Sequence, residues 1–164
     1  MRLFIALQLS EEMRDAVCRA QDAFRRQGVG GNYTRRENLH LTLAFIGEYG
    51  DPERVLDAIE AVPLRPFELR LEGLGAFGDL WWVGLKRSEP LERYVRSLRH
   101  ALAEADIPFD RKRFSPHITL IRRAERNGRD VSGEAVEGAG MTVDHIALMR
   151  SDRGKAGMIY TEIV

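Results

Sequence analysis

The sequence predicts one domain of mixed helices and strands, built from two similar halves that face each other across a central cleft. The same order of elements occurs twice in its 164 residues: a strand, a serine-capped helix, a loop and a strand carrying His-x-Thr. Equivalent residues lie 77 or 78 positions apart in three pairs: Leu7 and Leu85, Ser10 and Ser88, and His40 and His117. Matching spacing at three unrelated features indicates a duplication, and we expect the two copies to pack about a pseudo-twofold axis. We therefore expect a single two-lobed domain over 1–164, with halves of about 1–75 and 78–164.

In the first half, apolar runs and alternating patterns predict strands, and capping residues ahead of apolar residues at helical spacing predict helices. Ser10 caps the first helix, Gly28 ends it, and Asp51 with Pro52 begins the second. The predicted elements are a strand over 2–9, a helix over 10–28, a loop over 28–31, a strand over 38–46, a helix from 51 to about 61 and a strand over 67–74.

The second half follows the same rules. Ser88 caps a helix whose apolar stripe recurs at helical spacing through Leu91, Val95 and Leu98. The predicted elements are a strand over 80–86, this helix, a strand over 117–121, a weak strand near 131–136, and strands over 142–150 and 157–163 joined by a turn at 152–154.

Composition and charge exclude several classes of protein. The 25 basic and 25 acidic side chains give no net charge, so a global basic field that grips long nucleic acid is absent, although a local basic cleft is allowed. No apolar run approaches the ~18 residues of a membrane span, and the first residues lack the pattern of a secretory leader. We expect a cytoplasmic protein that does not bind a membrane.

Motifs for metals and for nucleotide cofactors are missing from the sequence. It contains no His-Glu-x-x-His, no clustered aspartates, no paired cysteines and no glycine-rich phosphate loop of the Walker or Rossmann kind. We expect no metal and no cofactor.

The two His-x-Thr elements carry the chemistry. Alternation along a strand places His40 and Thr42 on one face, and the second copy does the same with His117 and Thr119. Opening a cyclic phosphodiester needs a base that deprotonates water and an acid that protonates the leaving oxygen, and histidine serves both roles near neutral pH. The threonine hydroxyls and a cation, for which Arg122 is the first candidate, would hold the non-bridging oxygens. The symmetry of the copies leaves acid and base unassigned at this point.

The two remaining histidines are interpreted as structural or solvated. His100 falls on a helix face beside arginines, which favours a solvated side chain. His145 shares a strand face with apolar residues, which favours a structural role, with a place in the cleft as the alternative.

The sequence resembles the two-histidine phosphoesterase superfamily, and more narrowly the bacterial and archaeal RNA 2′,3′-cyclic phosphodiesterases, also called 2′-5′ RNA ligases. The matching stretches are MRLFIAL at 1–7, ENLHLTLAFIGE at 37–48, SPHITLIR at 115–122 and HIALMRS at 145–151. The resemblance implies an α+β, bilobal fold with two antiparallel sheets around a central cleft and helices packed outside. It also implies hydrolysis of a terminal 2′,3′-cyclic phosphate to a 2′-phosphate without metal or nucleotide.

The same resemblance assigns roles to individual residues. His40 would be the general acid that protonates the 3′ leaving oxygen, and His117 the general base that activates water. Thr42 and Thr119 would bind the phosphate, and Arg122 matches the arginine that follows the second motif.

Two other functions are compatible with the sequence. The same fold would act on another cyclic phosphate, such as an ADP-ribose cyclic phosphate or a small cyclic nucleotide, or on a 2′-5′ oligonucleotide. Alternatively, the chain is a non-catalytic binder of RNA ends, with aromatic side chains that stack on bases. Tyr33, Phe45, Trp81 and Trp82 are the candidates for stacking, with Tyr33 and Phe45 placed first. Core packing is the alternative for these aromatics, and Tyr33 is the expected exception to it.

In every case we expect a monomer whose partners are RNA ends or small cyclic nucleotides. Ligation through a 2′-5′ bond is expected to be secondary, because hydrolysis dominates unless two RNA ends are held together.

Overall fold

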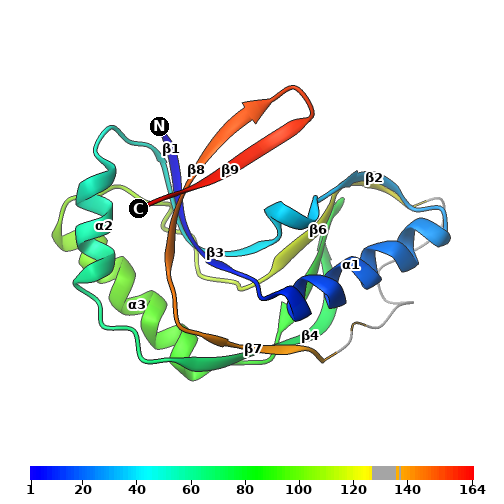
Figure 1. The fold of residues 1–164 in the computed structure, drawn as a ribbon, viewed down its shortest axis with the longest axis horizontal. Helices are drawn as coiled ribbons and strands as arrows, with labels where there is room; N and C mark the ends of the chain where they lie inside the picture. The colour runs from blue at the N-terminus through cyan, green and yellow to red at the C-terminus, as the bar shows by residue number, and fades with distance from the viewer. Residues whose placement is uncertain (127–135, 137) are drawn as a thin grey trace.

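Nine β-strands, three α-helices and one 3-10 turn make up the described part of the chain, residues 1–126, 136 and 138–164 of a computed structural model (Figure 1). In chain order these are β1 (Arg2–Gln8), α1 (Glu11–Arg26), β2 (Gly30–Tyr33), η1 (Arg36–Asn38), β3 (His40–Glu48), α2 (Pro52–Glu60), β4 (Phe67–Phe77), β5 (Leu80–Leu85), α3 (Glu89–Glu104), β6 (Ile118–Glu125), β7 (Gly140–Val143), β8 (Ala147–Gly154) and β9 (Gly157–Ile163).

The strands form two sheets in which every pair of neighbours is antiparallel. Their orders are β3-β1-β8-β9 and β2-β6-β5-β4-β7. In each sheet the strand of a His-x-Thr element pairs with the strand that opens its half, and a strand from the other half comes next. The predicted α+β fold with two antiparallel sheets is confirmed. Because each sheet holds strands from both halves, the boundaries of the halves stay a prediction.

The helices begin where the capping residues predict. Ser10 Oγ accepts a hydrogen bond from the backbone N–H of Met13, and Ser88 Oγ accepts one from Leu91, each at 3.2 Å. Helix α1 packs against β6 and β7 of the five-stranded sheet, whereas α3 packs against α2 and against β3 of the other sheet (Figure 1). The helices therefore cover the two sheets from outside.

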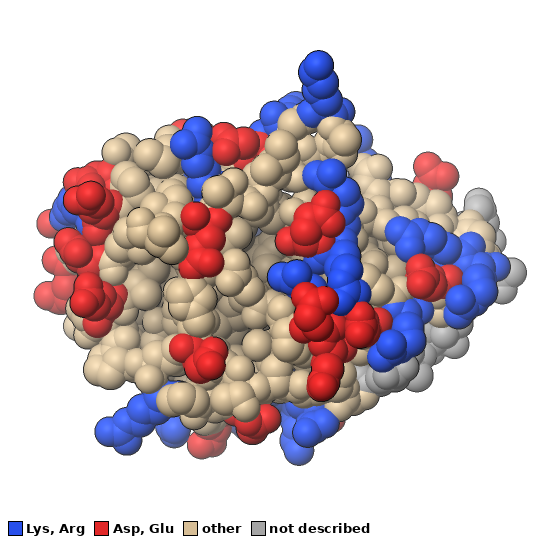
Figure 2. Space-filling model, viewed as in Figure 1, with Lys and Arg blue, Asp and Glu red and all other residues tan. Residues whose placement is uncertain are grey.

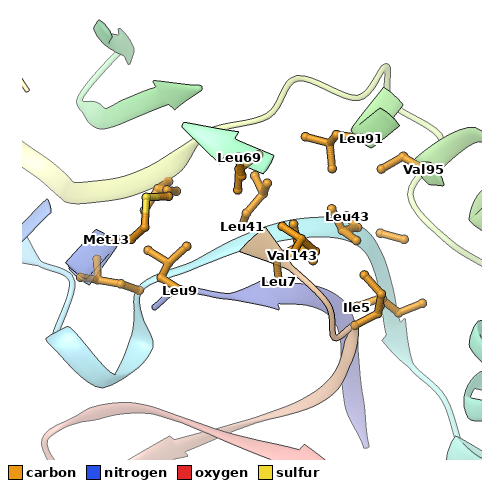
Figure 3. Packing of buried hydrophobic residues seen from close by; sticks show 14 of the residues in the cluster. Ile5, Leu7, Leu9, Met13, Leu41, Leu43, Leu69, Leu91, Val95 and Val143 are labelled. Carbon is orange, nitrogen blue, oxygen red and sulfur yellow. The ribbon is translucent and has the colours of Figure 1, made fainter. Parts of the chain in front are cut away.

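The main core joins the two sheets. Leu7 of β1 and Leu41 and Leu43 of β3 are almost fully buried, and they lie close to Leu69 of β4 and Val143 of β7 (Figure 3). Burying these side chains removes apolar surface from water, which is the main favourable term in folding. The two lobes consequently share one core.

A smaller apolar cluster lies on the other face of the four-stranded sheet. Phe4 and Ala6 of β1 pack with Ala147 and Met149 of β8. The Phe4 ring is 5.0 Å from the His40 ring, between centroids. This cluster therefore packs against His40 through the ring of Phe4.

One strand was not expected. The loop predicted over 28–31 contains the start of β2, which extends the five-stranded sheet beside β6. Gly31 has a φ of +133°, and a Cβ there would lie 2.8 Å from Ile121 Cγ2. The glycines permit a close approach of two strands, although in the sequence they resemble a turn.

The strand predicted over 142–150 is wrong as a single element. Strand β7 ends at Val143 and pairs with β4, whereas β8 begins at Ala147 and pairs with β1 in the other sheet. The chain changes sheets over 144–146, and alternation alone does not reveal which sheet a residue joins.

The turn predicted at 152–154 is also displaced. Strand β8 continues to Gly154, which lies opposite Gly157, so the turn falls on Lys155 and Ala156. Gly157 adopts a φ of +123°, which favours glycine. The weak strand predicted near 131–136 lies outside the described residues, except for Val136.

Candidate active site

A bulge in each histidine strand changes which side chains share its face. In β3 the pairing with β1 skips Leu43, and in β6 the pairing with β5 skips Leu120. An extra residue reverses the alternation beyond it. Phe45, five residues after His40, therefore joins the histidine's face, and we find Arg122 at the equivalent place in the second copy.

Both imidazoles are held by the same kind of hydrogen bond, to the backbone oxygen of the residue two positions earlier. His40 Nδ1 lies 2.7 Å from the backbone oxygen of Asn38, and His117 Nδ1 lies 2.7 Å from the backbone oxygen of Ser115. A carbonyl oxygen only accepts hydrogen bonds, so Nδ1 carries the proton in each ring. The Nε2 atoms are left to exchange protons with a substrate.

His40 is packed between aromatic rings. Phe4 lies on one side, and the Tyr160 ring from β9 meets His40 edge-on at 5.3 Å. His40 Nε2 is 2.9 Å from Thr42 Oγ1, the hydroxyl of its own His-x-Thr element.

Burial is the largest influence on His40, and it lowers the pKa of this imidazole because the charged form loses its hydration. The bond to the Asn38 carbonyl opposes this effect, and the positive charges of Arg122 and His117 lower the pKa further. Neutral His40 accepts a hydrogen bond from the Thr42 hydroxyl through Nε2.

His117 has its own aromatic neighbours. The Phe77 ring meets it edge-on at 5.2 Å, and Trp82 of β5 lies at 6.2 Å. Thr119 follows on β6 opposite Trp82. No hydrogen bond occupies His117 Nε2 among the described residues.

Two adjoining chambers open at the histidines. The first, of about 630 Å³, is called the His40 chamber. It is lined by Met1, Arg2, Phe4, His40, Thr42, Phe45, Glu48, Arg122, Ser151, Asp152, Arg153, Met158 and Tyr160.

The second, of about 330 Å³, is called the His117 chamber. It is lined by Thr42, Leu43, Ala44, Phe45, Phe77, Arg99, Asp110, Lys112, Arg113, Phe114, Ser115 and His117. Thr42 and Phe45 line both chambers, so the two form one groove with a histidine on each side.

The groove is basic although the whole chain is neutral. Of the two carboxylates in the His40 chamber, Glu48 pairs with the amino group of Met1 at 3.3 Å and Asp152 with Arg150 at 3.0 Å. Figure 2 shows Lys and Arg side chains beside the hollow at the middle of the molecule, with Asp and Glu side chains next to them, and a further group of Asp and Glu at the end where α2 lies. Unpaired cations suit a phosphate. In the described part of the chain, the arginines of this chamber without an ion pair are Arg2, Arg122 and Arg153.

Asn38 links His40 to the β8–β9 hairpin. Its side-chain Nδ2 donates to the backbone oxygen of Met158 at 2.9 Å, while its own backbone oxygen accepts from His40. Asn38 is only 9% exposed. Arg35 also donates to Met158, at 2.6 Å, from the surface. The orientation of His40 is thereby tied to the position of β9.

A larger groove, of about 730 Å³, lies elsewhere, between α2 and α3. It includes Tyr94, whose burial raises its pKa to about 12, and His100, but neither His40 nor His117. We assign the active site to the smaller chambers because they hold the paired acid–base groups.

The structure brings together most of the residues predicted for the site. His40, Thr42, Phe45 and Arg122 line one chamber, and His117 lies in the next.

Tyr33, a predicted stacking residue, is not brought to the groove. Its hydroxyl donates to the backbone oxygen of Val29, and Arg25 covers its ring at 4.2 Å. Trp81 is fully buried, as expected for the core, whereas Trp82 lies beside His117.

His100 is exposed beside Glu104, and His145 is bonded to Glu162 at 2.6 Å. Neither lies in the chambers of the two catalytic candidates.

Sequence reasoning missed several groups that line the site. They come from the start of β1, from hairpins and from the loop before His117: Arg2, Tyr160, Arg153, Phe77, Lys112, Arg113 and Phe114. The basic run at 111–113 was a readable signal, because it directly precedes the second His-x-Thr element.

Two further findings concern the described residues. No three side chains of His, Cys, Asp or Glu come together there as a metal site would require. None of the helices there has the length and apolar character needed to cross a bilayer.

Two imidazoles that line one basic groove, each with a threonine two residues later in the chain, are what an acid–base phosphoesterase requires. The family model of the 2′-5′ RNA ligase superfamily matches residues 13–155. The chain belongs to this superfamily.

Relatives and solved structures agree with this assignment. An RNA 2′,3′-cyclic phosphodiesterase from Methanothermobacter thermautotrophicus is 31% identical over 99% of this chain and 96% of its own length. A crystal structure of a protein from Thermus thermophilus superposes with a TM-score of 0.84 at 32% identity, covering 100% of this chain and 96% of the other. LigT of Escherichia coli complexed with phosphate gives a TM-score of 0.79 at 26% identity, over 99% and 94% of the two chains.

Proposed function

We propose that this chain opens the 2′,3′-cyclic phosphate at an RNA end by acid–base catalysis and leaves a 2′-phosphate. The observation that carries the proposal is a pair of imidazoles, each fixed through Nδ1, at two chambers that share Thr42 and Phe45. The name of the Methanothermobacter relative, an RNA 2′,3′-cyclic phosphodiesterase, supports this substrate.

In the proposed reaction, His117 Nε2 takes a proton from water as the water oxygen bonds to phosphorus. The bond from phosphorus to O3′ breaks on the opposite side, and His40 Nε2 gives its proton to O3′. Entering and leaving oxygens lie roughly in line in such displacements. The assignment of base and acid follows the family resemblance.

The acid must be charged before it can donate, whereas burial lowers the pKa of His40 in the empty site. A bound phosphate anion favours the imidazolium form and raises the pKa again. Substrate binding therefore prepares the acid.

The phosphate is held by groups on both histidine strands. Thr42 and Thr119 hydroxyls and the Arg122 guanidinium would bind its non-bridging oxygens, and charge-assisted bonds of this kind strengthen as charge develops. The phosphate complex of E. coli LigT supports an anion site in this fold. Phe45, at the junction of the chambers, would contact the base or ribose.

The proposal needs no metal and no cofactor, because both proton transfers are supplied by side chains. A 5′-hydroxyl that replaced water would give a 2′-5′ linkage as a secondary reaction. The monomeric state and the cytoplasmic location stay predictions.

The test is turnover of an oligoribonucleotide that ends in a 2′,3′-cyclic phosphate, with the position of the product phosphate read out. We expect a 2′-phosphate, with and without EDTA, and no turnover by His40→Asn or His117→Asn. A 3′-phosphate product would reverse the leaving group, and normal turnover by either variant would overturn the proposal.

A further inference from the structure

The groove between α2 and α3, of about 730 Å³, takes no part in the proposed reaction (Figure 1). It shares no lining residue with the His40 chamber or with the His117 chamber. Its volume is within the range of roughly 300–1,000 Å³ that is usual for cavities holding small organic ligands. The groove is therefore large enough for a ligand of its own.

Apolar side chains from two parts of the chain line this groove. Val62 and Leu64 belong to the connection between α2 and β4, Phe67 is the first residue of β4, and Tyr94 and Ala101 belong to α3. Tyr94 is only 6% exposed, whereas Phe67 is half-buried. Aromatic and aliphatic groups of this kind suit the flat ring of an organic ligand.

The ionisable side chains of the groove, tyrosine apart, are all basic. They are Arg65, Arg93, Arg96 and His100, and no Asp or Glu of the described residues lines the groove. The ligand that such a lining favours is an anion.

Carboxylates outside the groove lie near two of these four basic groups. On α3, Glu89 lies 3.9 Å from Arg93 and Glu104 lies 3.8 Å from His100. Both pairs are one helical turn apart and exposed, so they hold the basic groups only weakly.

The other two basic groups, Arg65 and Arg96, are exposed and make no ion pair in the part of the chain that the structure describes. Two unpaired guanidinium groups match the charge of one phosphate monoester, which is about −1.5 to −2 at neutral pH. A carboxylate or a phosphodiester carries a single negative charge and would leave one cation unmatched. Charge therefore favours a phosphate monoester.

The connection that carries Arg65 is held in place before any ligand binds. The backbone N–H of Ala61 donates to the backbone oxygen of Asp57 at 3.0 Å, and that of Val62 donates to Ile59 at 3.1 Å. Pro63 follows, and its ring fixes φ. A preformed lining lowers the entropic cost of binding.

We propose that the α2–α3 groove is a second binding site of this chain, for a small phosphate monoester that carries an aromatic ring, as a nucleoside monophosphate does. The phosphate pairs with Arg65 and Arg96, and the ring lies against Phe67 and Tyr94. The site is separate from the reaction proposed at His40.

The experiment titrates the ¹⁵N-labelled chain with adenosine 5′-monophosphate and follows the backbone amides by NMR. Leu64 and Ser97 report on the groove, whereas Thr42 and Tyr160 report on the His40 chamber. We expect the amides of the groove to shift along a saturable binding curve of their own. Adenosine, which lacks the phosphate, and ribose 5-phosphate, which lacks the ring, should each bind there at least tenfold more weakly.

The decisive variant combines Arg65→Gln with Arg96→Gln. It should weaken binding at the groove at least tenfold, since bonds from charged donors to the phosphate are lost, and should leave the curve of the His40 chamber unchanged. The matched control combines Arg26→Gln with Arg87→Gln, which removes the same charge from exposed residues that do not line the groove. The control should leave both curves unchanged, and thermal unfolding midpoints should show that both variants are folded.

Three results would overturn the second site. They are shifts confined to Thr42 and Tyr160, equal weakening by the control variant, and equal or tighter binding at the groove by the dinucleotide adenylyl-(3′→5′)-adenosine, whose phosphate is a diester. None of these results bears on the proposed hydrolysis, and failure of that hydrolysis would leave the second site standing.

Discussion

The two His-x-Thr strands are built alike and differ at one position that faces the groove. Each has an imidazole fixed by the carbonyl two residues earlier, a threonine two residues later and a bulge at the next residue. Five residues after the histidine, the first copy has Phe45 and the second has Arg122. The duplicated strands supply two imidazoles at one groove, and the unlike residues five positions later, Phe45 and Arg122, make that groove asymmetric.

The surroundings of the two imidazoles also differ. His40 is half-buried between the rings of Phe4 and Tyr160, with its Nε2 bonded to Thr42. His117 lies beside the half-exposed Phe77 at a smaller chamber. The two duplicated histidines therefore differ through their neighbours, since the His40 ring is shielded by aromatic rings and the His117 ring faces an open chamber.

The largest effect should come from removing either imidazole. His40→Ala and His117→Ala should each lower kcat/KM by about 10²–10⁴, because each ring carries one of the two proton transfers. The measurement is steady-state hydrolysis of a 2′,3′-cyclic nucleotide. Thermal unfolding midpoints close to that of the wild type would show that the fold is retained. Loss of activity in only one variant would show that only one of the two histidines is needed for the reaction.

Substitutions of Phe45 and Arg122, the residues five positions after each histidine, should have unequal effects on activity. Arg122→Gln removes the cation that stabilises charge on the phosphate, and a loss of about 10²–10³ in kcat/KM is expected, as for other groups that stabilise a developing oxyanion. Phe45→Leu keeps an apolar wall and removes only ring contacts, each worth about 0.5–1.5 kcal/mol, so its loss should be tenfold or less. Equal losses would show that Arg122 acts through packing and not through charge.

The same arginine should also change the pH profile. As an acid, His40 works only while protonated, so kcat/KM falls as pH rises through its pKa. Burial first, and then the charges of Arg122 and His117, lower that pKa, so the alkaline limb lies below the position of an ordinary histidine. Arg122→Gln removes one lowering influence and should move this limb to higher pH. A limb that stays in place or moves down would contradict the assignment of His40 as the acid.

The sequence was sufficient to predict the repeat, the caps and the face on which each histidine lies, because these depend on local spacing. It did not predict β2, since the glycines that allow its close approach to β6 also resemble a turn. It missed the change of sheet between β7 and β8 for a related reason: the partner of a strand is a tertiary property.

For the site, too, the features that depend on local sequence were predicted and those that depend on tertiary contacts were not. Residues on the histidine strands were found, whereas groups contributed by hairpins, such as Phe77 and Tyr160, were not. Tyr33 shows the converse, because nothing in its local sequence revealed that Arg25 would cover its ring.

The smallest expected effect tests how His40 is positioned. Asn38 and Arg35 both donate to the Met158 carbonyl, but only Asn38 also orients His40. Asn38→Ala should lower kcat about tenfold with little change in KM, because a less firmly placed Asn38 carbonyl holds the His40 ring less well in its reacting orientation. Arg35→Gln should change kcat less, because it loosens the same hairpin from the exposed side.

The pH profile separates positioning from mere loss of stability. The bond to the Asn38 carbonyl raises the pKa of His40, so weakening that bond lowers the pKa. In Asn38→Ala the alkaline limb of kcat/KM should therefore move to lower pH, opposite to its movement in Arg122→Gln. A lower kcat with an unmoved limb, or an equal effect of Arg35→Gln, would show that Asn38 only anchors the β8–β9 hairpin.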